Sequence, residues 1–144
     1  MAELTSGEQH FRPESASELP EHFHLLAEFA MLATPADPFD PMEKAIQHFG
    51  HQWLQGTEHV HDGREPEFEY ALSGEILAMT RVFASDEPNV HLLATKGAPE
   101  AVADMLGMPD AWRFDPCSLW AAVSRQASQP TQPAQAGFFT PEER

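Results

Sequence analysis

Residues 92–102 read LLATKGAPEAV, and this stretch decides the expected fold. Its apolar first half is typical of a buried strand, which stops at a lysine and a glycine. Pro99 suits the first position of a helix, because no amide hydrogen is needed there. Glu100 in the first turn complements the helix dipole. The stretch therefore predicts a strand that turns directly into a helix.

The turn itself is a candidate binding site. Gly97 has no side chain, so a flat ligand has room to lie against the backbone there. Lys96 adds a positive charge beside the unpaired amides of the helix start, a combination that attracts phosphate. The alternative is that Lys96 is an edge-strand charge that discourages aggregation. Its position next to a glycine and a helix start favours the binding interpretation.

Two further strands are expected before this one. Phe68, Tyr70 and Leu72 alternate with polar residues, the pattern of a strand with one face in solvent and the other in the core. Residues 76–83 and 90–96 are the next two apolar runs, with turn signals between the three. Three successive strands with short links predict an antiparallel meander.

Two helices are expected upstream of the strands. Residues 20–33 carry apolar side chains at helical spacing. Asp40 is a natural N-cap, Pro41 follows at the first helical position, and the helix is predicted to run to about Leu54. Glu43 lies at the edge of its inward stripe, where it is either a first-turn acid favoured by the helix dipole or a ligand contact. The expected fold class is α+β: a twisted antiparallel β-sheet flanked by helices.

A single domain is expected for 144 residues. Residues 1–19 are polar and are predicted to form a flexible N-terminal segment. Residues 118–125 have the spacing of a further helix. Residues 126–144, rich at first in Gln, Pro, Ser and Ala, are predicted to be a disordered tail. The folded domain is therefore expected to span residues 20–125.

Charge and composition exclude several classes of partner. The formal net charge of -15 repels polyanions, so no nucleic acid and no anionic membrane surface is expected to bind. Cys117, the single cysteine, cannot form an internal disulfide. No stretch approaches the roughly 20 apolar residues that cross a bilayer, and the N-terminus has no signal-peptide pattern. The chain is expected in the cytoplasm without direct membrane insertion.

Three segments together resemble one protein family. Residues 96–100, KGAPE, are similar to a signature of the nucleotide-binding (N) domain of P-type cation-transporting ATPases. Residues 40–46, DPMEKAI, resemble the aspartate-proline-x-glutamate-x-alanine segment of that domain, and residues 69–80 resemble the strand pair between the two motifs. Their order and spacing fit the N domain, and the similarity runs from about Leu19 to about Met105.

The resemblance implies a pocket for ATP, or Mg-ATP, formed by the sheet and the two motifs. Glu43 would hydrogen-bond near the adenine amino group, and Lys96 would line the pocket and reach the ring or a phosphate. Gly97 and Ala98 would let the base approach the backbone. The implied nucleotide-binding residues are Glu43, Leu72, Ser73, Met79, Lys96, Gly97 and Ala98.

Two positions depart from the family pattern. The aromatic that stacks on adenine in the calcium-pump branch corresponds to Leu72, or to Tyr70 if the register slips. A position that is often basic corresponds to Leu77. Loss of an aromatic stacking partner removes roughly 1–3 kcal/mol per base, so low affinity for ATP is expected.

The family's catalytic parts are missing from this sequence. It has no phosphorylated-aspartate motif, no magnesium-binding aspartate segment, no dephosphorylation loop and no membrane domain, so we expect ATP binding without turnover and no catalytic residue. The expected partners are other domains or subunits of a P-type ATPase. Two alternatives are an interaction, regulatory or relic protein that keeps the fold but has lost strong nucleotide binding, and an independent ATP hydrolase.

The histidines raise a metal hypothesis. His48 and His51 are three residues apart on the second predicted helix, and His59 and His61 lie with Asp62 in a loop. No cysteine supports a metal site there. A solvated, histidine-rich loop is the favoured interpretation, and no metal is expected.

Overall fold

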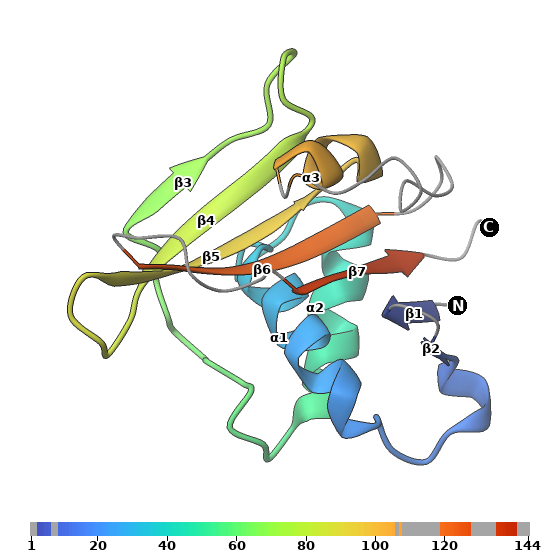
Figure 1. The fold of residues 1–144 in the computed structure, drawn as a ribbon. Helices are drawn as coiled ribbons and strands as arrows, with labels where there is room; N and C mark the ends of the chain where they lie inside the picture. Colours follow the sequence, from blue (N-terminus) through green and yellow to red (C-terminus); the bar gives the residue numbers. More distant parts are fainter. Residues whose placement is uncertain (1–2, 7–8, 106, 108–118, 128–134, 141–144) are drawn as a thin grey trace.

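The computed structural model describes residues 3–6, 9–105, 107, 119–127 and 135–140. These residues form a mixed α+β fold in which two long helices lie against one face of an antiparallel sheet (Figure 1). The predicted fold class is confirmed at this level. Within the described part of the chain, no helix is both long enough and apolar enough to span a membrane.

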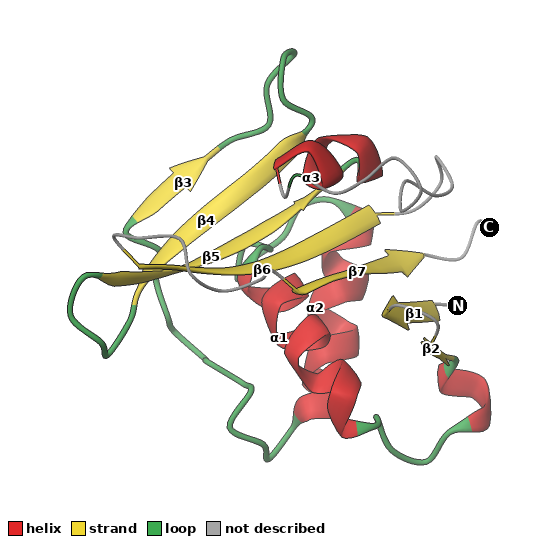
Figure 2. Cartoon of the chain, in the orientation of Figure 1, coloured by secondary structure: helices red, strands yellow, loops and turns green. Residues whose placement is uncertain are grey.

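The described residues form three α-helices, two short 3-10 helices and seven strands (Figure 2). The helices are η1 (Pro13–Ser15), η2 (Glu21–Phe23), α1 (His24–Leu32), α2 (Pro41–Leu54) and α3 (Pro99–Met105). The strands are β1 (Glu3–Ser6), β2 (Gln9–Phe11), β3 (Phe68–Tyr70), β4 (Ala78–Ala84), β5 (Val90–Gly97), β6 (Leu119–Ala127) and β7 (Gln135–Thr140).

Strands β3, β4 and β5 form the predicted antiparallel meander. Strands β1 and β2 form a second antiparallel pair, and β1 also pairs with β7. β6 and β7 stand between these two groups, so the strand order is β2-β1-β7-β6-β5-β4-β3. The meander thus ends at β3, and no described strand lies beyond it.

Two predictions about the C-terminal part are wrong. Residues 119–127 form β6 instead of the helix predicted at 118–125, because their backbone pairs with β5 along its whole length. Residues 135–140 form β7, so this part of the predicted disordered tail is in the sheet. The remainder of the predicted tail, 128–134 and 141–144, lies outside the described residues.

Helix α2 begins as its sequence predicts. The Asp40 carboxylate accepts hydrogen bonds from the backbone amides of Met42, at 2.8 Å, and of Glu43, at 3.3 Å. Pro41 occupies the first helical turn, where its missing amide hydrogen costs nothing. This N-cap fixes the position of Glu43 in the first turn of α2.

The main hydrophobic core lies between α1, α2 and the N-terminal strands. Its members come from both helices and, at Leu4, Phe11 and Leu19, from the segment predicted to be flexible. Leu4 is 0% exposed and Phe11 is 4% exposed. Burial of these two apolar side chains stabilises the packing of β1 and β2 against the helices, although Gln9 and His10 stay exposed. The core cluster comprises Leu4, Phe11, Leu19, Phe23, Leu26, Ala27, Ala30, Ile46, Phe49 and Leu54.

Strand β3 differs from its prediction in burial. Phe68 and Tyr70 were expected to face the core but are 61% and 64% exposed. They pair in register with Val82 and Thr80, whereas Arg81, between these two on β4, contacts the end of α1. Since side chains alternate between the faces of a strand, the β3 aromatics lie on the sheet face that points away from α1 and α2.

The burial of Phe11 gives a test of whether the N-terminal strands belong to the fold. Its ring contacts those of Phe23, Phe49 and Trp53, with centroids 5.3–6.2 Å apart. We expect Phe11→Ala to lower the free energy of unfolding by roughly 3–5 kcal/mol, measured by urea denaturation. The same change at Phe39, which is 95% exposed, should cost almost nothing. Equal effects of the two substitutions would show that residues 9–11 do not pack on the core.

Candidate functional site

Glu43 and Lys96, from two motifs 53 residues apart, meet in the folded chain. Lys96 stands at the end of β5, and its ammonium group donates a hydrogen bond to the Glu43 carboxylate at the start of α2. Lys96 is 6% exposed, and the Glu43 side chain is 16% exposed. The two residues therefore form a nearly buried ion pair at the place where the sequence predicted a binding site.

Thr34 completes this cluster from the end of α1. It is 1% exposed, its hydroxyl donates to the Ala30 carbonyl at 2.8 Å, and the same oxygen lies 3.4 Å from the Lys96 ammonium that donates to it. Its carbonyl oxygen accepts hydrogen bonds from Gln47 of α2, at 3.2 Å, and Arg81 of β4, at 2.8 Å. Thr34 thus joins two helices and two strands at one point.

Met79 also lies at this cluster, and Ala98 follows directly after β5. Met79 pairs with Lys96 in the β4–β5 register, so the two side chains share the sheet face that carries α1 and α2. Met79 is partly buried. The Ala98 amide donates to the Leu77 carbonyl at 2.8 Å, which fastens the start of α3 to the entrance of β4. The structure therefore brings together three of the predicted residues, Glu43, Met79 and Lys96, and ties the Ala98 amide to Leu77.

Gly97 does not provide the open surface expected of it. A Cβ atom at this position would lie 2.5 Å from the Cα of Ala78 and would also meet the Leu77 carbonyl. The space beside the glycine is therefore filled by the backbone of β4. Gly97 is needed for close strand packing, and a ligand does not reach it from that side.

Leu72 and Ser73 lie in the loop that joins β3 to β4, outside the hydrogen bonds that join Lys96 to Glu43 and Thr34. Leu72 is 60% exposed. The Ser73 hydroxyl accepts a hydrogen bond from the Ile76 amide at 3.0 Å and so serves the turn itself. Tyr70, the alternative stacking residue, lies on the sheet face opposite Lys96. No aromatic from this segment stands over the ion pair.

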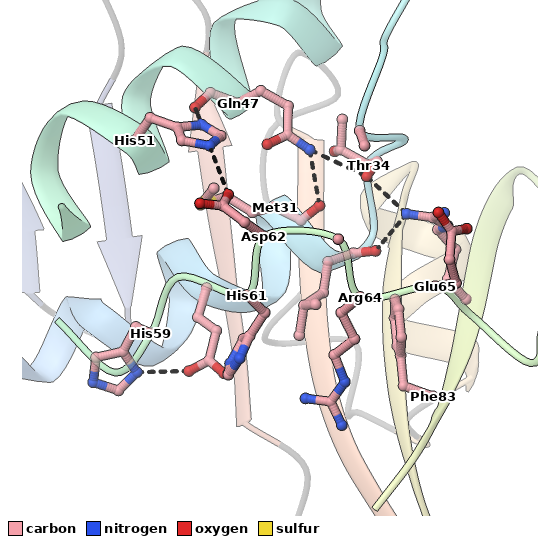
Figure 3. Close-up of a pocket in the computed structure, with 15 residues that line it drawn as sticks. Met31, Thr34, Gln47, His51, His59, His61, Asp62, Arg64, Glu65 and Phe83 are labelled. Atoms are coloured by element: carbon pink, nitrogen blue, oxygen red, sulfur yellow. Dashed lines mark hydrogen bonds and ion pairs between the residues drawn. The ribbon is translucent and has the colours of Figure 1, made fainter. Parts of the chain in front are cut away.

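A cavity of about 290 Å³ opens on the other side of Thr34 (Figure 3). Glu43 and Lys96 are not among the residues that line it. Its wall is formed by residues 28–36 of α1 and the segment after it, Gln47 and His51 of α2, the loop at residues 59–65, and Arg81 and Phe83 of β4. Sequence reasoning missed this cavity, because its lining comes from four separate segments without a common motif.

Histidines hold the loop of the cavity against α1. His59 Nδ1 and His61 Nε2 each lie 2.6 Å from a different oxygen of the Glu28 carboxylate. His51 Nε2 lies 3.4 Å from an Asp62 oxygen. Among the described residues, no group of three or more histidine, cysteine or acidic side chains is arranged to hold a metal ion. The two histidines of the His-x-His pattern therefore contact the Glu28 carboxylate in this structure.

Comparison with known proteins adds no assignment: no family model matches the chain, and no curated protein matches it. The resemblance to the N domain thus depends on the three short segments and on their spacing.

Close packing at Gly97 predicts a large cost for an added methyl group. We expect Gly97→Ala to reduce the free energy of unfolding by roughly 1–3 kcal/mol, because backbone atoms of β4 must shift. Gly74→Ala is the matched control, since nothing lies within 4 Å of a Cβ there and its φ is not positive. Urea denaturation of both variants measures the difference. An unchanged stability for Gly97→Ala would mean that the β4–β5 register is not as described.

The ion pair predicts strong coupling between Glu43 and Lys96. Glu43→Ala should cost roughly 3–5 kcal/mol of stability, because it leaves the buried ammonium without its counter-charge. Adding Lys96→Met to that variant should restore part of the loss, as measured by a double-mutant cycle in urea. Lys44→Met, at an exposed position on the same helix turn, is the control. Strict additivity of the two substitutions would contradict the contact.

Proposed function

We propose that this chain is a weak adenine-nucleotide-binding module, of the kind found in the N domain of P-type cation-transporting ATPases, and that it binds ATP without hydrolysing it. One observation supports this proposal above the others. The two motifs that resemble the family meet through Glu43 and Lys96, with Met79 on the same face. A pocket built from these two motifs requires that they lie side by side in the folded chain. Chance similarity of two short segments would not require it.

In this proposal the nucleotide exchanges one ion pair for two contacts of its own. The adenine amino group donates a hydrogen bond to the Glu43 carboxylate. The Lys96 ammonium donates to the ring or to a phosphate. Both groups are nearly buried, so they lose little solvation when the ligand arrives. However, loss of the Glu43–Lys96 ion pair offsets much of the binding free energy that the two new contacts supply.

Three further features favour low affinity. Leu72 points to solvent instead of stacking on a base, the surface beside Gly97 is filled, and the chain carries a formal charge of -15. The charge repels the phosphates at long range. Dissociation constants in the millimolar range, equivalent to about -4 kcal/mol, are the expected result.

In this proposal the chain works as one part of a cation pump. The other domains or subunits of a P-type ATPase, on the cytoplasmic side of a membrane, would supply the phosphorylated aspartate. The second candidate is an interaction or regulatory protein that keeps the fold without the ligand. The exposed apolar side chains between Phe68 and Leu77 favour it.

Titration with ATP, followed by amide chemical shifts, tests the proposal. Millimolar ATP should shift the amides of Glu43, Lys96 and Ala98, and Lys96→Met should weaken binding at least five-fold. Lys44→Met removes a neighbouring exposed charge and should leave the affinity within two-fold. With magnesium present, phosphate release should stay at the buffer rate. Absence of shifts at 10 mM ATP, or equal weakening by both variants, would rule out this site.

A further inference from the structure

Exposed apolar side chains gather on one segment of the chain. Seven large apolar side chains of the described residues are more than half exposed, and five of them lie within ten residues. These five define what we call the apolar strip: Phe68 at 61%, Tyr70 at 64%, Leu72 at 60%, Ile76 at 53% and Leu77 at 51%. Scattered exposed apolar residues are normal, but a contiguous group marks an interaction surface.

The apolar strip begins on an edge strand. β3 is the outermost strand of the sheet on that side, so one of its backbone edges has no described strand beside it (Figure 1). Phe68 and Tyr70 stand on the sheet face that points away from α1 and α2. An open edge with alternating apolar side chains has the features to which an extended peptide adds as a further strand.

The charge around the apolar strip restricts the partner. Residues 65–77 contain four glutamates and no lysine, arginine or histidine. Glu69 contacts Arg81 at 3.1 Å, and Glu67 contacts His91 at 3.4 Å, yet both carboxylate side chains remain more than 40% exposed. Glu75 is also exposed. The edge therefore combines apolar contacts with a negative field.

We propose that the β3 edge and its apolar strip bind an extended segment of a partner protein in which lysine or arginine alternates with apolar side chains. The segment adds to the sheet as a strand beside β3, its apolar residues cover Phe68 and Tyr70, and its cations face the glutamates. A second copy of this chain is disfavoured, since pairing two β3 edges would set glutamates against glutamates.

This docking site is separate from the nucleotide site. Lys96 and Met79 occupy the sheet face covered by α1 and α2, and Phe68 and Tyr70 occupy the other face. Peptide binding can therefore be changed without touching Glu43 or Lys96. Failure of one proposal leaves the other standing.

A nine-residue peptide of alternating valine and lysine is the probe, with a valine–glutamate peptide of the same length as its control. The valine–lysine peptide should bind the full chain and slow hydrogen exchange of the β3 amides, and the glutamate peptide should bind at least ten-fold more weakly. Phe68→Ser with Tyr70→Ser should reduce binding at least ten-fold. Phe39→Ser, at a position 95% exposed outside the apolar strip, should leave it unchanged.

Four results would overturn the docking proposal. The first three are equal binding of both peptides, no loss of binding in the Phe68 and Tyr70 double variant, and protection found only at amides outside β3. Sedimentation of the chain alone, between 10 µM and 1 mM, tests whether a second copy of this chain binds the β3 edge. A dimer that the double variant abolishes would assign the edge to a second copy and would also overturn the proposal. Since both aromatics are mostly exposed, the variant should keep the native circular dichroism spectrum.

Discussion

The arrangement of this molecule depends on one buried cation. Lys96 is 6% exposed, and a charge in that position requires a counter-charge and hydrogen-bond acceptors. Glu43 and Thr34 supply them from the start of α2 and the end of α1. This requirement holds two helix ends against one strand end. The same requirement leaves the ion pair as the point at which a ligand carrying both an amino group and a phosphate would compete.

Thr34 extends the influence of that ion pair to the cavity. Its carbonyl accepts from Arg81, whose guanidinium also contacts Glu69 and lies over the ring of Phe83. One wall of the cavity beside Thr34 is a loop that Glu28 holds through two histidines. Polar side chains thus line the cavity beyond the end of α1, whereas the sheet face directly under α1 is apolar, with Phe83 and Ala94 packed against Phe29, Leu32 and Ala33. Removal of the Lys96 ammonium would take away a hydrogen bond to the Thr34 hydroxyl.

The two faces of the meander have different characters. The covered face carries Met79 and Lys96, with the helices packed upon it, and supports the nucleotide proposal. The other face carries Phe68 and Tyr70 at a strand edge, and supports the docking proposal. This division follows from strand alternation, because neighbouring residues of one strand must point in opposite directions. A module that holds a ligand on one face and a partner on the other is compatible with both proposals.

The sequence by itself determined the local elements. The N-cap at Asp40, the proline after Gly97 and the turn signals between strands act within a few residues, so α2, α3 and the β3–β5 meander were predictable. Only the tertiary structure decided which surfaces are buried. Leu4 and Phe11 are buried and Phe68 is exposed because burial depends on what packs opposite a side chain, which local pattern does not contain. The motifs predicted that Glu43 and Lys96 would meet. They did not predict that β4 would fill the space beside Gly97, because that depends on which atoms pack opposite the glycine.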